Sequence, residues 1–152
     1  MKFKLLSIII ITLFLSGCAL LKQTSQVAGN KLDLSNQQLK KVPEHVFNQT
    51  NLVELNLSNN QLTGAIQSQI GQLKKLKIFN ASDNLMTGVP AEIGQLKNLE
   101  VLDLSNNQLT GLPNELGNLK NLKTFNVSGN DYSELDLNGI EKNLPAGVKV
   151  IK

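Results

Sequence analysis

The side chains best suited to catalysis are few in this sequence. There is one cysteine, Cys18, and one histidine, His45, and there is no arginine. A catalytic thiol needs a nearby base, and a zinc site needs three or four Cys, His or carboxylate ligands. The carboxylates Asp83 and Asp103 remain as a conceivable acid–base pair, and no glycine-rich phosphate loop accompanies them. We therefore predict a protein that is not an enzyme and that uses no metal and no cofactor.

The N-terminus has the pattern of a secretory signal. Lys2 and Lys4 precede an apolar run over residues 5–15, and Leu15-Ser16-Gly17-Cys18 follows. A basic start, a short apolar run and small residues after it are typical of a signal peptide. The run is too short for a membrane span, which needs about 20 apolar residues.

Leu15-Ser16-Gly17-Cys18 resembles the lipobox of bacterial lipoproteins. The resemblance implies cleavage between Gly17 and Cys18, a thioether-linked diacylglycerol on Cys18 and a fatty acid such as palmitate on its new amino group. Residues 1–17 are then a removed signal peptide and 18–28 a lipidated cysteine with its tether. We expect lipid anchoring in the outer membrane if the source has one, and otherwise in the outer leaflet of the cell membrane. The alternative is an ordinary secretory signal with an incidental cysteine.

A five-fold repeat fills the rest of the chain. Leu32-Asp33-Leu34-Ser35 returns at residues 55–58, 79–82, 102–105 and 125–128, at spacings of 23, 24, 23 and 23 residues. A period of this length indicates a solenoid whose coils bury their apolar residues by stacking on one another. Alternation of apolar and polar residues predicts a short strand in each coil, with one face buried.

The repeat, Leu-x-x-Leu-x-Leu-x-x-Asn-x-Leu, resembles the leucine-rich repeat family over residues 29–152. The resemblance implies an α/β solenoid: a leucine-rich-repeat coil with a short parallel sheet on its concave face and short helical or irregular return segments. We expect about five repeats and a truncated closing strand at Val148-Lys149-Val150, with Leu135, Leu137, Ile140 and Leu144 packed beneath it.

Several positions of the repeat have expected structural roles. An amide column should satisfy backbone groups at the turn after each strand; it comprises Gln37, Asn60, Asn84, Asn107 and Asn130. In the return segments, a proline should start a helical turn and a glycine should end it. The second repeat is one residue longer and has Gln67 at the proline position, so we expect a small bulge on the outer surface.

The residues between the leucines of each strand should form the concave face. The candidate partner-binding residues are Glu54, Asn56, Ile78, Asn80, Val101, Asp103, Thr124 and Asn126. The leading column (Lys31, Glu54, Ile78, Val101 and Thr124) varies and includes two adjacent apolar residues, which favours a contact role. The central column (Asp33, Asn56, Asn80, Asp103, Asn126, then Lys149) and a column of serines could equally be polar residues that only tolerate water.

The charge pattern excludes a nucleic-acid binder. The formal charge of +3 includes Lys2 and Lys4, and from Cys18 onward 13 lysines face 12 acidic residues, whereas nucleic-acid binding requires a strongly basic face. Six lysines form a lysine rim where return segments re-enter the strands: Lys74, Lys75, Lys77, Lys97, Lys120 and Lys123. This rim is either a solvated edge or a weak site for anionic lipid headgroups or cell-surface polymers.

The sequence thus predicts a monomeric binding module for an unidentified protein or peptide, anchored by lipid at the bacterial envelope. The alternative is a structural or accessory surface lipoprotein with no dedicated ligand.

Overall fold

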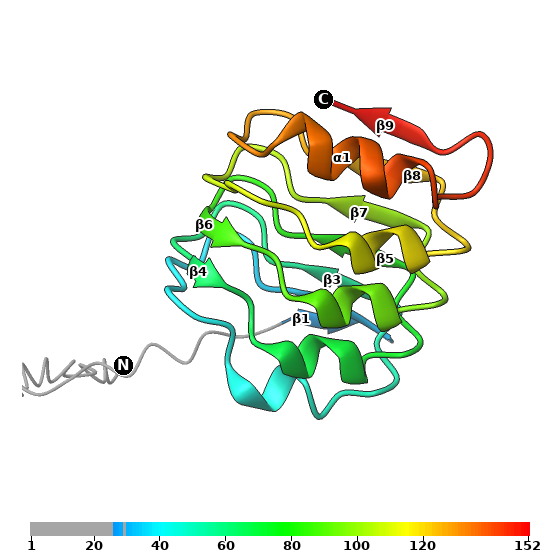
Figure 1. Cartoon of the computed structure of the whole chain (residues 1–152). Coiled ribbons are helices and arrows are strands. Elements are labelled where there is room, and N and C mark those ends of the chain that lie inside the picture. Colours follow the sequence, from blue (N-terminus) through cyan, green and yellow to red (C-terminus); the bar gives the residue numbers. More distant parts are fainter. Residues whose placement is uncertain (1–25, 29) are drawn as a thin grey trace, which may run out of the picture.

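The computed structural model describes residues 26–28 and 30–152, and Gly17 and Cys18 lie outside these residues. The chain winds into a solenoid with one strand of the main sheet in each coil and a short helix on the opposite side (Figure 1). The seven-stranded sheet has the order β1-β2-β3-β5-β7-β8-β9. The predicted α/β solenoid with a parallel sheet and short helical return segments is confirmed.

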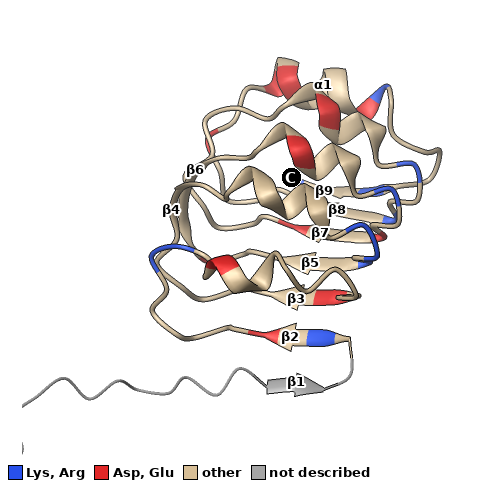
Figure 2. Ribbon diagram, turned by 90° about the horizontal axis from the view of Figure 1, so that it is seen from below, with Lys and Arg blue, Asp and Glu red and all other residues tan. Residues whose placement is uncertain are grey.

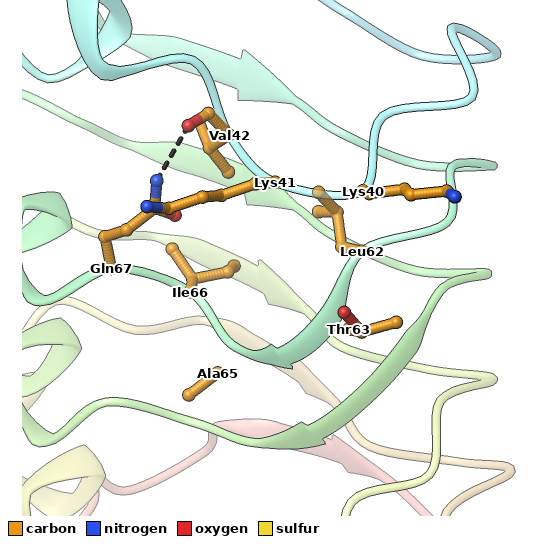
Figure 3. Close-up of a pocket in the computed structure, with 8 residues that line it drawn as sticks. All are labelled: Lys40, Lys41, Val42, Leu62, Thr63, Ala65, Ile66 and Gln67. Atoms are coloured by element: carbon orange, nitrogen blue, oxygen red, sulfur yellow. Dashed lines mark hydrogen bonds between the residues drawn. The ribbon is translucent and has the colours of Figure 1, made fainter.

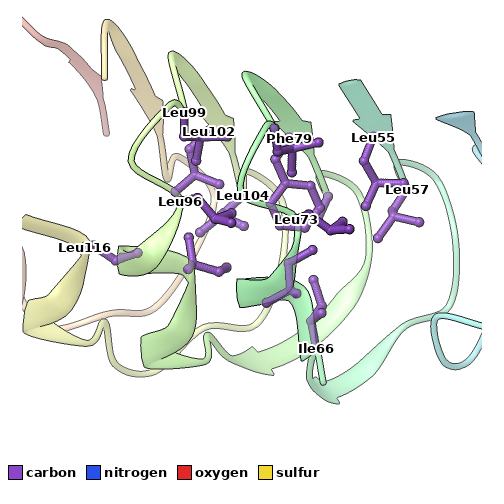
Figure 4. Close-up of a cluster of buried hydrophobic side chains, with 14 of the residues drawn as sticks. Leu55, Leu57, Ile66, Leu73, Phe79, Leu96, Leu99, Leu102, Leu104 and Leu116 are labelled. Carbon is purple, nitrogen blue, oxygen red and sulfur yellow. The ribbon is translucent and has the colours of Figure 1, made fainter. Parts of the chain in front are cut away.

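Six parallel strands, of which the first five carry the repeat at the expected register, form most of the main sheet. They are β2 (Lys31–Asp33), β3 (Glu54–Asn56), β5 (Ile78–Asn80), β7 (Val101–Asp103), β8 (Thr124–Asn126) and β9 (Lys149–Ile151). In the first five of these strands the central residue is buried and pairs with its equivalent one coil away, as Leu55 does with Phe79 and Phe79 with Leu102. Stacked leucine and phenylalanine side chains thereby form one continuous core (Figure 4).

Both ends of the sheet differ from the sequence prediction. β1 (Gln26–Ala28), expected to belong to the tether, pairs antiparallel with β2 and forms the first strand of the sheet. The closing strand is present but offset by two residues, because Phe125 pairs with Val150 rather than with Val148. Ile151 therefore takes the sixth place in the central column, and Lys149 moves to the leading column beside Thr124. The residues between β8 and β9 form a helix, which changes the length of this last coil.

The return segments are 3₁₀ helices: η1 (Glu44–Val46), η2 (Ser68–Gln72), η3 (Ala91–Gln95) and η4 (Asn114–Asn118). The prolines do not start the helical turns as predicted. Pro43, Pro90 and Pro113 have extended backbone and lie just before η1, η3 and η4. The extended conformation at Gln67 before η2 is nearly identical (φ −61°, ψ 141°), so glutamine replaces proline there without changing the path of the chain.

The glycines of these segments do not end the helices as predicted. Gly94 and Gly117 are buried inside η3 and η4. A Cβ at Gly94 would overlap the backbone carbonyl of Glu115 in the next coil, and one at Gly117 would approach Cβ of Asn143 at 2.7 Å. Glycine is needed because the helices of adjacent coils pack backbone to backbone.

The longer second repeat forms β4 (Thr63–Ala65), which pairs in parallel with β6 (Leu85–Gly88) in a second, two-stranded sheet. The register shifts between Gly64 and Ala65, and Gly64 has a φ of +68°. The expected bulge is therefore present, within a small sheet on the side of the coil away from the starts of the main strands (Figure 1).

The last coil contains α1 (Glu134–Glu141), which packs against η4. Ser133 caps it by accepting a hydrogen bond from the Leu135 backbone N–H. Leu137 and Ile140 are buried and Leu144 packs against the core, as expected. The expectation that Leu135 packs in the core is wrong, because its side chain lies on the solvent face of α1 and is 82% exposed.

Candidate binding face

The leading column brings two apolar side chains together at the head of the main sheet. Ile78 in β5 pairs directly with Val101 in β7, between Glu54 on one side and Thr124 on the other. Ile78 is 37% exposed and Val101 is partly exposed. Lys31 pairs with Glu54 in the same way, so the five residues predicted for this column are in register and reachable from solvent.

The central column has a structural role that the sequence analysis did not assign. The Oδ1 atom of Asp103 accepts the backbone N–H of Ser105 at 2.9 Å and its hydroxyl at 2.6 Å. The equivalent contact to the backbone two residues on recurs at Asp33, Asn56, Asn80 and Asn126. Because Asp and Asn form this turn readily, the column fixes how each strand ends, and one oxygen of each side chain is already engaged.

Of the two columns that follow, the serine column does not face water as predicted, whereas the residues directly after the serines are exposed. Ser58, Ser82 and Ser105 are buried. The next position has left-handed backbone in every coil: Asn36, Asn59, Asp83 and Asn106 have φ between 52° and 57°, and Gly129 has 68°. Asn, Asp and Gly tolerate this conformation best. The residue types at this position therefore fit the bend of the chain.

The amide column forms a ladder of hydrogen bonds between coils. Asn107 donates from Nδ2 to the carbonyls of Ala81, Leu104 and Ser105, and its Oδ1 accepts the Met86 N–H. Asn60, Asn84 and Asn130 make the equivalent contacts. At the first position the Gln37 N–H donates to Oδ1 of Asn60. Each of the four asparagine side chains thus satisfies backbone groups of two coils at once.

The residues considered for catalysis do not assemble. His45 is exposed in η1. Oδ1 of Asp83 accepts a hydrogen bond from Asn106, whereas Oδ2 of Asp103 accepts one from Asn126. Within residues 30–152, no group of three His, Cys, Asp or Glu side chains is placed to hold a metal.

The lysine rim lies along one edge of the main sheet, where the strands begin (Figure 2). Nζ of Lys97 donates to the carbonyls of Gly94 and Asn118, and Nζ of Lys120 donates to those of Gly117 and Asn143. These ammonium groups therefore bind carbonyls near the ends of η3 and η4 and one after the helix of the last coil, and they connect adjacent coils, a role that the sequence did not indicate.

Glu100 connects two further rim lysines across three coils. Its carboxylate lies 3.2 Å from Nζ of Lys77 and 2.6 Å from Nζ of Lys123. The hydrogen bonds from Lys123 and then from Lys77 hold the pKa of the Glu100 carboxyl below its usual value. These three residues, with Asn98 and Asn121, line an open polar cavity of about 220 Å³.

Two other hollows are present in the described part of the chain. One, between the first two coils, has a volume of only about 10 Å³, enough for a single water; there Nε2 of Gln67 donates to the Val42 carbonyl at 2.7 Å (Figure 3). The other, of about 450 Å³, lies at the C-terminal end of the solenoid between α1 and β9, beside Leu144 and Val150. Over the described residues, the structure contains no helix with the length and apolarity that crossing a bilayer requires.

Family comparisons cover most of the repeat region. A model described as leucine rich repeat matches residues 30–86, and one described as leucine rich repeats in two copies matches residues 74–114 and 97–141. No match was found among curated protein sequences.

Three solved structures illustrate the likeness. A leucine-rich repeat protein of Leptospira interrogans is 38% identical with a TM-score of 0.70, over 76% of this chain and 29% of that one. The ectodomain of the Arabidopsis thaliana receptor kinase GASSHO1/SCHENGEN3, in complex with CASPARIAN STRIP INTEGRITY FACTOR 2, is 34% identical with a TM-score of 0.57, over 60% of this chain and 11% of that one. The Arabidopsis receptor kinase HAESA, in complex with the peptide hormone IDA and the co-receptor SERK1, is 33% identical with a TM-score of 0.55, over 60% of this chain and 16% of that one. The chain spans less than a third of the length of each.

Proposed function

Because this chain belongs to the leucine-rich repeat family, we propose that it binds a protein or peptide through its concave sheet while lipid on Cys18 holds it, as a monomer, at a bacterial envelope. Domains of this family commonly bind proteins, and two of the similar structures are complexes with peptide or protein partners. Membership of the family supports binding of a protein or peptide in general, and the residues of this chain indicate which part of the surface binds it.

The observation that carries the proposal is the adjacent pair of Ile78 and Val101 at the head of the sheet. The central and serine columns and the column with left-handed backbone have structural roles, and in the leading column Lys31 and Glu54 form an ion pair with Nζ and Oε2 2.7 Å apart. This leaves Ile78, Val101 and Thr124 as the residues of the leading column without such a contact. Exposed apolar side chains in contact with each other lose water favourably when a partner covers them. The flanking Glu54 and Thr124 could then provide polar contacts at either end of the pair.

The size of the sheet favours a narrow partner. Six parallel strands span roughly 24 Å across and about 10 Å along the three-residue strands, so the face offers on the order of 240 Å². A stable protein–protein interface takes about 800 Å² from each partner. An extended peptide segment therefore fits the sheet better than a flat globular surface does.

A capture experiment with a matched control tests the binding proposal. Ile78→Ala with Val101→Ala removes the apolar pair, and Leu85→Ala removes a comparably exposed leucine (44%) from β6 in the other sheet. After cross-linking in native envelopes, we expect a partner to be recovered with the wild type and with Leu85→Ala, and to be lost with the double variant. Equal recovery from all three would contradict a site at Ile78 and Val101, and recovery from none of them would instead favour a structural lipoprotein with no dedicated ligand.

The anchor is tested separately by metabolic labelling with palmitate. We expect the wild type to incorporate label and to partition into detergent, and Cys18→Ala to do neither. The lipobox resemblance supports this expectation, because Cys18 follows Leu15-Ser16-Gly17 at the end of the apolar run. Normal labelling of Cys18→Ala would contradict the anchor, whatever the capture experiment shows.

A further inference from the structure

The lysine rim keeps its positive charge although its side chains are held in place. In segments 73–77, 96–100 and 119–123, which contain all six rim lysines, Glu100 is the one acidic residue. Four of these lysines hydrogen-bond to neutral oxygens: Lys74 to Gln95, Lys75 to Asn51, and Lys97 and Lys120 to backbone carbonyls. A carbonyl orients an ammonium group without neutralising it. The rim is therefore a fixed positive edge.

The cavity formed by Lys77, Asn98, Glu100, Asn121 and Lys123 lies within this edge. Each ammonium group has three N–H donors, and one donor of each lysine is directed at Glu100. The two lysines therefore retain donors, and the three charged side chains together carry a net charge of +1. Because their positions are already fixed, an incoming acceptor would order few additional side chains.

The cavity adjoins the proposed binding face directly. Lys77 precedes Ile78, Glu100 precedes Val101 and Lys123 precedes Thr124 in the sequence, so the polar cavity begins where the leading column begins. A ligand that covers the apolar pair can therefore reach the two lysines. In an extended peptide, neighbouring side chains project to opposite sides. One segment can therefore direct its apolar side chains toward the leading column and its charged side chains toward the cavity.

We propose that this cavity is a carboxylate subsite, and that the peptide bound by the concave sheet carries an acidic side chain between Lys77 and Lys123 while an apolar side chain covers Ile78 and Val101. This inference rests on the proposed function and adds to it the chemistry of the partner. A singly charged carboxylate suits the subsite because it balances the net charge of +1 on Lys77, Glu100 and Lys123, whereas a phosphate would leave an excess of negative charge there.

The course of β1 argues against a lipid headgroup as the occupant. β1 runs antiparallel to β2. Ala28 therefore pairs with Lys31 at the edge where the rim lies, and Gln26 pairs with Asp33 at the opposite edge of the sheet. A chain anchored at Cys18 would join the sheet at Gln26 after eight residues, a reach of at most about 28 Å. The chain thus enters the sheet at the edge opposite the rim, which favours a peptide over a lipid headgroup as the occupant.

Binding of two defined octapeptides to the mature domain tests the subsite. The acidic probe is acetyl-(Leu-Glu)₄-amide and the neutral probe is acetyl-(Leu-Gln)₄-amide, and the binding of each is measured by isothermal titration calorimetry. We expect the acidic probe to bind at least tenfold more tightly, and its affinity to weaken as salt screens the lysines. Lys77→Gln with Lys123→Gln should remove this preference, and Lys77→Arg with Lys123→Arg should keep it. Lys40→Gln with Lys41→Gln, which changes two exposed lysines outside the rim, should leave it unchanged.

Equal binding of the two probes, or an undiminished preference in the Lys77→Gln and Lys123→Gln variant, would overturn the subsite. So would failure of the acidic probe to bind at about 1 mM, the weak end of useful affinities. Binding to phosphatidylglycerol vesicles that depends on Lys77 and Lys123, with no preference between peptides, would assign the edge to lipid instead. The capture experiment with Ile78→Ala and Val101→Ala is independent of these lysines, so the concave-face proposal can stand when the subsite fails.

Discussion

Gly94 lies so close to the backbone carbonyl of Glu115 in the next coil that a Cβ at this position would overlap it. Gly88, in β6, differs: a Cβ there would meet only the Ala65 Cβ, at an ordinary 3.7 Å. The two glycines, six residues apart, thus have different roles. The first sets the distance between coils, and the second has room for a larger residue.

Gly94→Ala should destabilise the protein by about 1–3 kcal/mol, the usual cost of forcing extra atoms into a packed interior. The backbone of η4 would have to move, because a carbonyl oxygen cannot rotate away as a flexible side chain can. Urea unfolding followed by circular dichroism measures the effect. Gly88→Ala is the matched control and should change the free energy of unfolding by less than about 0.5 kcal/mol; equal effects of the two variants would contradict the packing role.

Asn107→Ala should destabilise the protein by about 1–3 kcal/mol, because it leaves buried backbone groups in two coils without partners. The groups affected include the Met86 N–H and the Ala81 carbonyl. Chemical denaturation gives the magnitude. Gln108→Ala changes the neighbouring exposed side chain and should be nearly neutral; an equally small effect at Asn107 would show that the ladder does not stabilise the fold.

Glu100 should make the stability of the domain depend on pH. Its pKa is lower in the folded protein because Lys123 and Lys77 bond the carboxylate, so the folded state binds this proton less readily than the unfolded chain does. The stabilisation is complete above the unfolded value of 4.5 and is lost as the pH falls through the lower folded pKa.

Urea midpoints of wild type and Glu100→Gln between pH 2 and 7 test this dependence. We expect Glu100→Gln to be less stable at neutral pH and the difference to shrink steadily in acid. Glu115→Gln removes an exposed carboxylate that has no ion pair among the described residues, and it should leave the profile unchanged. A difference between wild type and Glu100→Gln that stays constant with pH would refute the linkage.

The repeat could be predicted from sequence because the same residues recur at a fixed spacing. Each coil places its leucines inside and its asparagine at the turn, so aligning the copies gave both the register of Ile78 with Val101 and the amide ladder. The closing strand was misplaced by two residues because α1 interrupts the repeat there, and a fixed period cannot anticipate an irregular coil.

Other features depend on contacts between coils, which a single repeat does not show. Gly94 has the sequence position of a helix end, and its role becomes clear only beside Glu115. Lys97 has the pattern of a solvated residue, yet its ammonium group binds carbonyls in two coils. Asp103 has the pattern of a surface residue, yet it holds the backbone of Ser105. In each case the partner lies across a turn or in a neighbouring coil.

Site-specific photocross-linking in living cells tests the central claim most directly. A benzoylphenylalanine at position 78 places the reactive group at the head of the concave sheet, and one at position 85 places it on the other sheet at similar exposure. We predict a discrete cross-linked partner from position 78 that is absent from position 85. Cross-linking from position 85 alone, or from neither position, would contradict a concave binding face.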